Sequence, residues 1–223
     1  MSPDILFPLY LSLKVSTIAT LIAIIVAIPT AWIMSKKNSK VMEFLDSIFN
    51  LPLVLPPTVL GYYLLVAVGR RSVIGSWLES NFGISLVFTW KAAVLASLIV
   101  SIPILLKASR TAFLGVDKNL IYAARTLGRS EHSIFLTITL PLASRGILAG
   151  IVLTFARALG DFGTTLMVAG NIPGKTQTMP LAIYDAVQVG DMAQANALVL
   201  IITITALLVI LLLGRLQGKG GQT

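Results

Sequence analysis

Few side chains in this sequence could take part in bond-making chemistry. There are no cysteines, and the single histidine, His132, has no second histidine with which to hold a metal ion. A membrane-embedded phosphatase or protease would need a nucleophile facing a base, and the carboxylates are not paired at a useful helical spacing. The sequence also lacks a Gly-x-x-x-x-Gly-Lys-Ser/Thr loop for ATP. We therefore expect no enzyme, and no catalytic residue, cofactor or metal site in this chain.

The most informative spacing lies in a polar stretch between long apolar runs, and it suits docking to another protein. Asp117 can cap a short helix with one apolar and one basic face. The apolar face holds Leu120, Ala123, Ala124 and Leu127, and the other face holds Lys118, Tyr122, Arg125 and Arg129. Gly128 suits the left-handed residue that ends such a helix, and Ser130 can cap the next one. A surface helix that merely joins two spans is the alternative.

The spacing in this stretch resembles the cytoplasmic loop signature of bacterial ABC importer permeases, which is Glu-Ala-Ala, three residues, Gly, nine residues, Ile, one residue, Leu-Pro. The matching residues are Tyr122, Ala123, Ala124, Gly128, Ile138, Leu140 and Pro141. Every spacing is met, and the one departure is Tyr122 in place of glutamate. The resemblance implies that residues 107–132 form a cytoplasmic coupling loop whose helix docks on an ATP-binding subunit.

The composition requires that the elements holding this loop be membrane helices. Hydrophobic residues make up 56%, charged residues 12%, and the mean hydropathy is +0.90. A chain of 223 residues has room for roughly five or six spans of about 20 residues and for no separate catalytic domain. We predict an all-α, polytopic transmembrane bundle, 1–223, with the type I ABC importer fold that the resemblance implies.

Long uncharged runs predict five spans. Three runs are uninterrupted and are bracketed by Lys14 and Lys36, by Asp46 and Arg70, and by Asp191 and Arg215. Two more spans, about 84–106 and about 133–157, contain Lys91 and Arg145. The region 161–191 has only short apolar runs around Pro173 and Gly174, so we interpret it as an outer loop with short or re-entrant helices.

The basic residues set the orientation of these spans. With the N-terminus outside, the inner side receives ten: Lys36, Lys37, Lys40, Lys107, Arg110, Lys118, Arg125, Arg129, Arg215 and Lys219. The outer side receives only Arg70, Arg71 and Lys175. This bias predicts that the coupling loop and the C-terminus lie in the cytoplasm. The resemblance implies that the membrane is the bacterial inner membrane. The net charge of +8 is thus largely an orientation signal, and nucleic-acid binding is not expected.

Prolines interrupt the second predicted span. Pro52, Pro56 and Pro57, followed by Thr58, cannot keep a full helical hydrogen-bond ladder because each proline removes a donor. Broken backbone survives in a membrane only where protein or a water-filled cavity satisfies it. We interpret this segment as part of the translocation path, near a gate. A packing kink is the alternative.

A second segment, at the outer end of the fourth predicted span, indicates which group of ABC importer permeases the chain resembles. Gly160, Asp161, Phe162 and Gly163, preceded by Arg157, look like a Leu-Gly-Glu-Phe-Gly stretch in permeases for tetrahedral oxyanions. The resemblance makes these five residues further candidates for the pathway or its gate. With the proline segment and the coupling loop, the chain most resembles molybdate permeases, from about Leu11 to Arg215. Permeases for tungstate or sulfate/thiosulfate are the alternative. An ion-gradient-driven transporter would favour acidic residues in midspan, and it would leave the loop signature unexplained.

Three cations lie in or near the outer halves of the predicted spans: Lys14, Lys91 and Arg157. Charges inside a membrane are costly and often functional, so one hypothesis is an electropositive funnel for a divalent oxyanion. The alternatives are snorkelling to the headgroups and, for Arg157, a pair with Asp161 four residues on.

The resemblance also implies the partners. These are a second copy of the permease, two ATP-binding subunits that hold ATP and Mg, an extracytoplasmic oxyanion-binding protein, and membrane lipid. On this account ATP-driven closure of the ATP-binding pair pulls on two coupling helices, and the spans rock between inward-open and outward-open states.

Overall fold

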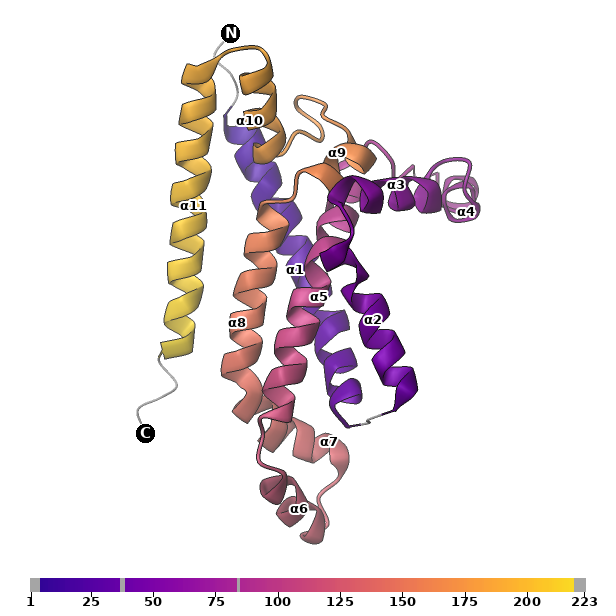
Figure 1. The fold of residues 1–223 in the computed structure, drawn as a ribbon, viewed down its shortest axis with the longest axis vertical. Helices are drawn as coiled ribbons and strands as arrows, with labels where there is room; N and C mark the ends of the chain where they lie inside the picture. Colours follow the sequence, from indigo (N-terminus) through magenta and orange to yellow (C-terminus); the bar gives the residue numbers. More distant parts are fainter. Residues whose placement is uncertain (1–4, 37–38, 84, 219–223) are drawn as a thin grey trace.

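The computed structural model describes residues 5–36, 39–83 and 85–218, with side chains at all of these except residue 213 and residues 215–218. Within these ranges the chain is helical, with no β-strand (Figure 1). The elements are α1 (Leu6–Lys36), α2 (Lys40–Val54), α3 (Pro57–Val68), α4 (Val73–Phe82), α5 (Trp90–Leu114), α6 (Lys118–Thr126), α7 (Glu131–Ile134), the π-helical turn η1 (Phe135–Thr139), α8 (Leu140–Leu159), α9 (Gly163–Ala169), α10 (Met179–Gln188) and α11 (Met192–Gly218).

Helices α1, α5 and α8 form the centre of the bundle, and small residues let them approach closely. On α1, fully buried alanines recur every four residues, at Ala19, Ala23, Ala27 and Ala31. A Cβ added at Gly150 of α8 would lie 2.6 Å from the Cβ of Ala108 on α5. Small residues at four-residue spacing are a common way to pack membrane helices, because backbone contact replaces the missing hydrophobic drive.

Among the described residues, four helices are long and apolar enough to cross a membrane, and the bent pair α2–α3 makes up to five. The predicted span between Asp46 and Arg70 is interrupted, as its prolines indicate, and α2 and α3 are bent by 114° at the break. The cause is Pro56 and Pro57, which end one helix and begin the next.

Helix α5 begins later than the third predicted span. We expected a span over about 84–106, but α5 begins at Trp90, where Thr89 caps it, and continues to Leu114. Lys91 therefore lies exposed in the first turn of α5, at the edge of this candidate span and away from its middle. The apolar residues before Trp90 misled the prediction because they resemble span residues in composition alone.

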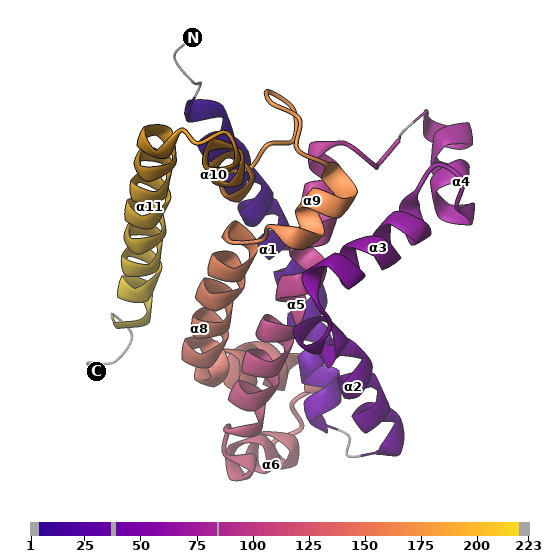
Figure 2. The same cartoon turned by 45° about the horizontal axis from the view of Figure 1, so that its top comes forward.

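The region 161–191 contains two short helices, α9 and α10, at the end of the bundle opposite α6 (Figure 1). The interpretation as a loop with short helices is confirmed in its secondary structure. Asp185 orders it by accepting hydrogen bonds from Asn171 Nδ2 at 2.7 Å and Gln177 Nε2 at 2.8 Å. Figure 2 shows α11 to one side of the bundle and the bent pair α2–α3 on the other. Lys37 and Lys219, used in the orientation count, lie outside the described residues.

Candidate functional site: the coupling loop and the broken helix

The coupling loop forms as its local sequence predicts. Asp117 Oδ1 accepts a hydrogen bond from the Asn119 N–H at 2.9 Å, which caps α6. Gly128 has a φ of +75°. The N–H groups of Gly128 and Arg129 donate hydrogen bonds to carbonyl groups of α6. Ser130 Oγ then caps α7. These local predictions are confirmed, and the two caps hold α6 as a projecting turn at one end of the bundle (Figure 1).

The apolar face predicted for α6 is divided between two environments. Ala124 is buried against the rest of the chain, whereas Leu120 is 47% and Leu127 is 82% exposed. Ala123 and Tyr122 are exposed as well. Only Ala124 thus packs inward, and the two leucines remain on a surface at the polar end of the bundle. Exposed leucines at this position suit a partner protein.

Glu131 ties the loop to the end of α1, and the sequence analysis missed it. Lys36 Nζ donates to Glu131 Oε2 at 2.7 Å, and Arg125 Nε donates to Glu131 Oε1 at 2.6 Å. Lys36 also lies 3.8 Å from the centre of the Trp32 ring. The hydrogen bond from Arg125 to Glu131 raises the pKa of Arg125. We call these four residues the Glu131 cluster.

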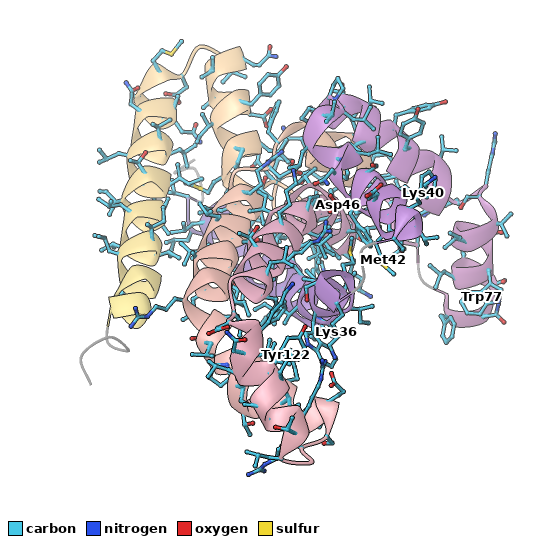
Figure 3. All side chains as sticks on the ribbon, turned by 60° about the horizontal axis from the view of Figure 1, so that its bottom comes forward. Lys36, Lys40, Met42, Asp46, Trp77 and Tyr122 are labelled. Atoms are coloured by element: carbon cyan, nitrogen blue, oxygen red, sulfur yellow. The ribbon has the colours of Figure 1, made fainter. Side chains whose placement is uncertain are left out.

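A cavity of about 240 Å³ lies beside this cluster. Tyr122 and Lys36 both line it, at the end of the molecule that comes forward in Figure 3. Its floor is aromatic, since Phe135 packs on Trp32 with ring centres 4.3 Å apart and on Phe113 at 6.0 Å. Charged side chains and apolar rings thus both line the space beside α6.

The second half of the signature forms the root of α8. Ile138 lies in the π-helical turn and is half-buried, as is Leu140, while Pro141 is exposed in the first turn of α8. The Leu140 N–H bonds to the Phe135 carbonyl, five residues back. Pro141 has no N–H, and this helps explain the irregular turn before it. These residues connect the loop to a spanning helix and do not form part of its exposed surface.

The two segments predicted to lie along the pathway meet in space. A Cβ added at Gly163 would lie 3.0 Å from Pro57 Cβ, and Thr164 Oγ1 donates to the Pro57 carbonyl at 3.2 Å. Pro56 and Thr58 are exposed beside this contact, and Pro52 lies within α2. The start of α9 thus covers the point where the broken helix resumes, and broken backbone in a membrane requires such protein contact.

Asp161 holds the chain between α8 and α9. Its side chain is buried, and Oδ2 accepts from Thr165 N at 3.0 Å and Oγ1 at 2.6 Å. Arg157 Nη1 lies 3.8 Å from Asp161 Oδ1, which is the local pair weighed as an alternative. Phe162 packs on Tyr184 with ring centres 5.1 Å apart, and Gly160 ends α8.

The three cations of the predicted funnel occupy separate local settings. Lys14 Nζ lies 4.0 Å from the centre of the Trp90 ring, Lys91 is exposed at the start of α5, and Arg157 pairs with Asp161. The contacts around Lys14 and Arg157 favour the local alternatives, and the funnel stays a prediction.

Comparisons with known proteins agree with this architecture. The sequence profile described as "Binding-protein-dependent transport system inner membrane component" matches residues 17–219. The chain is 44% identical over 217 residues to a molybdenum transport system permease protein of Haemophilus influenzae, covering 95% of each chain. It is 46% identical over 203 residues to the protein of that name in Escherichia coli, covering 91% of this chain and 89% of that one. An inward-facing structure of the MetNI methionine ABC transporter superposes with a TM-score of 0.78 over 100% of both chains, at 16% identity. The expected all-helical permease fold is confirmed.

Proposed function

Because the chain belongs to the family of binding-protein-dependent transport system inner membrane components, we propose that it is the permease subunit of an ATP-driven importer for molybdate. The relatives of 44% and 46% identity are named for molybdenum transport and match this chain over nearly their whole length. The cargo follows from them, and the bundle with its projecting loop follows from the structure.

The observation that carries the mechanism is the exposed surface of α6. Leu120 and Leu127 lie on a capped helix at the end of the bundle where the basic residues gather, which is the cytoplasmic end by the positive-inside rule. There α6 would dock on a partner ATPase, which would bind ATP and Mg. Two permease copies would pair with two such subunits, and an extracytoplasmic oxyanion-binding protein would deliver the cargo to the opposite end.

The contact between Pro57 and Gly163 is a candidate for the outer part of the gate. It joins the bent pair α2–α3 to α9, and it lies at the end of the bundle away from α6. A movement of the spans that starts at α6 would alter the angle at the bend, because α3 is held on α9 while α2 packs on α5. In this way a pull on the cytoplasmic side would open or close the path.

The test is ATPase activity of the complex in lipid, assembled with its ATP-binding subunits and a binding protein loaded with molybdate, tungstate or sulfate. Gly128→Asp would place a side chain at φ of +75° and distort the end of α6. We expect the binding protein with molybdate to stimulate ATP hydrolysis, and we expect that stimulation to be lost in the assembled Gly128→Asp complex.

The matched control is Gly190→Asp, since Gly190 also has positive φ, at +79°, but lies between α10 and α11. It should assemble and respond to the binding protein. Stronger stimulation by tungstate or sulfate would reassign the cargo. Transport that continues without ATP hydrolysis but stops with an uncoupler would replace the importer with an ion-driven transporter.

A further inference from the structure

Helix α2 is held to the bundle by few contacts. None of its residues is buried, and it packs mainly on α5, through the half-buried Met42, Leu45 and Phe49. At its far end it stops at the bend before Pro57, where α3 is fastened to α9. The bent pair is therefore held firmly where α3 contacts α9 and weakly where α2 packs on α5. The contact that holds α2 on α5 governs how α2 can move.

One ion pair secures it. Arg110 Nη1 of α5 lies 3.2 Å from Asp46 Oδ1 in the second turn of α2, and the two side chains are 22% and 29% exposed. Figure 3 places Asp46 on α2, on the same helix as Met42 and Lys40. Among the described residues, this is the ion pair recorded between α2 and another helix. Charges enclosed between apolar helices interact more strongly than charges in water, so the pair can hold two otherwise loosely packed helices.

The polar groups around this pair are incompletely satisfied. Asn50, one turn beyond Asp46 on the same face, donates to the Asp46 carbonyl at 2.7 Å, but its Oδ1 is buried without a hydrogen-bond partner. Arg110 Nε on α5 is likewise buried without a partner. A seam that leaves these two polar atoms unpaired is costly to keep closed, and opening it to water would satisfy them. The closed and open seams are therefore closer in free energy than they would be in a fully satisfied contact.

From this geometry we propose that Asp46 and Arg110 are positioning residues for transport, forming a latch that holds α2 on α5 in one state of the cycle and releases it in another. The proposal rests on the importer function proposed above. Release would let α2 swing about the bend at Pro56 while α3 stays against α9. Neither residue touches the cargo in this account; both act through the position of α2.

The experiment uses the full complex in lipid vesicles and measures ATP-driven molybdate uptake and ATP hydrolysis. Asp46→Asn and Arg110→Gln should each lower uptake about tenfold, with hydrolysis persisting without the binding protein. The double variant Asp46→Arg with Arg110→Asp restores opposite charges and should recover uptake to within about twofold. Glu79→Gln is the control, because Glu79 pairs with Arg70 in an exposed contact at 3.9 Å, and it should leave both activities unchanged.

A second measurement reports the seam directly. The chain has no cysteine, so Leu45→Cys places a single thiol where α2 packs on the bundle. We expect a water-soluble maleimide to label it about tenfold faster in one of two states, nucleotide-free or trapped with ATP and vanadate. Asp46→Asn in that background should bring the two rates together.

Equal labelling in both states would overturn the latch, and so would single variants that transport normally or a charge reversal that leaves uptake impaired. A wild-type complex that fails to move molybdate would instead overturn the proposed cargo. The labelling of Leu45→Cys would still decide the latch, since it does not depend on which anion is carried.

Discussion

The Glu131 cluster and the Asp46–Arg110 pair both join helices through opposite charges, yet they differ in how far water reaches them. The ion-paired side chains of the cluster are 37% to 48% exposed, and its carboxylate accepts two close charged hydrogen bonds. The pair is 22% and 29% exposed and has buried polar atoms without partners beside it. The cluster can therefore adjust at little cost, whereas any change at the pair alters the balance between two arrangements of α2.

Removing one charge of the enclosed pair should have the largest effect on stability. Arg110→Leu leaves Asp46 unpaired between apolar helices, and we expect a loss of about 2 kcal/mol, reduced from the fully buried case because the site is partly exposed. The midpoint of thermal unfolding in lipid nanodiscs would measure it. Adding Asp46→Leu should recover most of the stability but not the uptake, which separates the fold from the positioning of α2. Recovery of both would make the pair dispensable.

Neutralising the exposed cluster should have a smaller effect. Glu131→Gln removes both ion pairs but leaves the side chain in water, so we expect a loss of about 0.5 kcal/mol. Uptake should fall about threefold, because α6 is no longer tied to the end of α1. Glu43→Gln is a suitable control, since Glu43 is exposed and no ion pair is recorded for it among the described residues. A stability loss as large as that of Arg110→Leu would remove the distinction between the two regions.

Salt should separate the two regions further. Raising the ionic strength from about 0.1 M to about 1 M shortens the screening length from about 10 Å to about 3 Å. The difference in thermal stability between wild type and Glu131→Gln should then shrink, while that between wild type and Arg110→Leu should persist. Equal salt sensitivity would show that water reaches both sites alike.

The smallest effect is expected from Tyr122→Glu, which restores the usual residue of the family signature. Arg125 lies 5.8 Å from the Tyr122 ring centre, so a carboxylate there would compete with Glu131 for the same guanidinium. Because both acids would lie in water, we expect ATPase activity within about twofold of wild type. A larger change would mean that Tyr122 itself contacts the ATPase, and Tyr122→Phe would then test the hydroxyl.

The sequence predicted what is decided locally. Asp117, Gly128 and Ser130 cap or end helices within a few residues of themselves, and each does so in the structure. Pro56 and Pro57 likewise predicted a break in the helix. The direction of that break was not predictable, since the 114° bend depends on α9, more than 100 residues away.

Contacts between distant residues were missed for the same reason. Lys36 and Glu131 are 95 positions apart, and each looked like an ordinary charge beside a span. Asp46 was interpreted as the edge of a span and Arg110 as an orientation signal, so nothing suggested that they pair. Only the packing of α2 on α5 brings them together.

The π-helical turn Phe135–Thr139 preserves the direction in which the coupling helix faces. It accommodates one residue more than a regular helix would over the same rise, and each residue of an α-helix turns the chain by about 100°. Deleting one residue there would convert the turn to regular helix and leave the direction of α7 largely unchanged, whereas deleting one residue from the α-helical turn Glu131–Ile134 would rotate everything before it by about 100° about the helix axis. The nine residues between Gly128 and Ile138 therefore fix the rotation of the coupling helix about the α8 axis as well as its distance from α8. This rotation decides the side of the molecule from which a partner can reach Leu120 and Leu127.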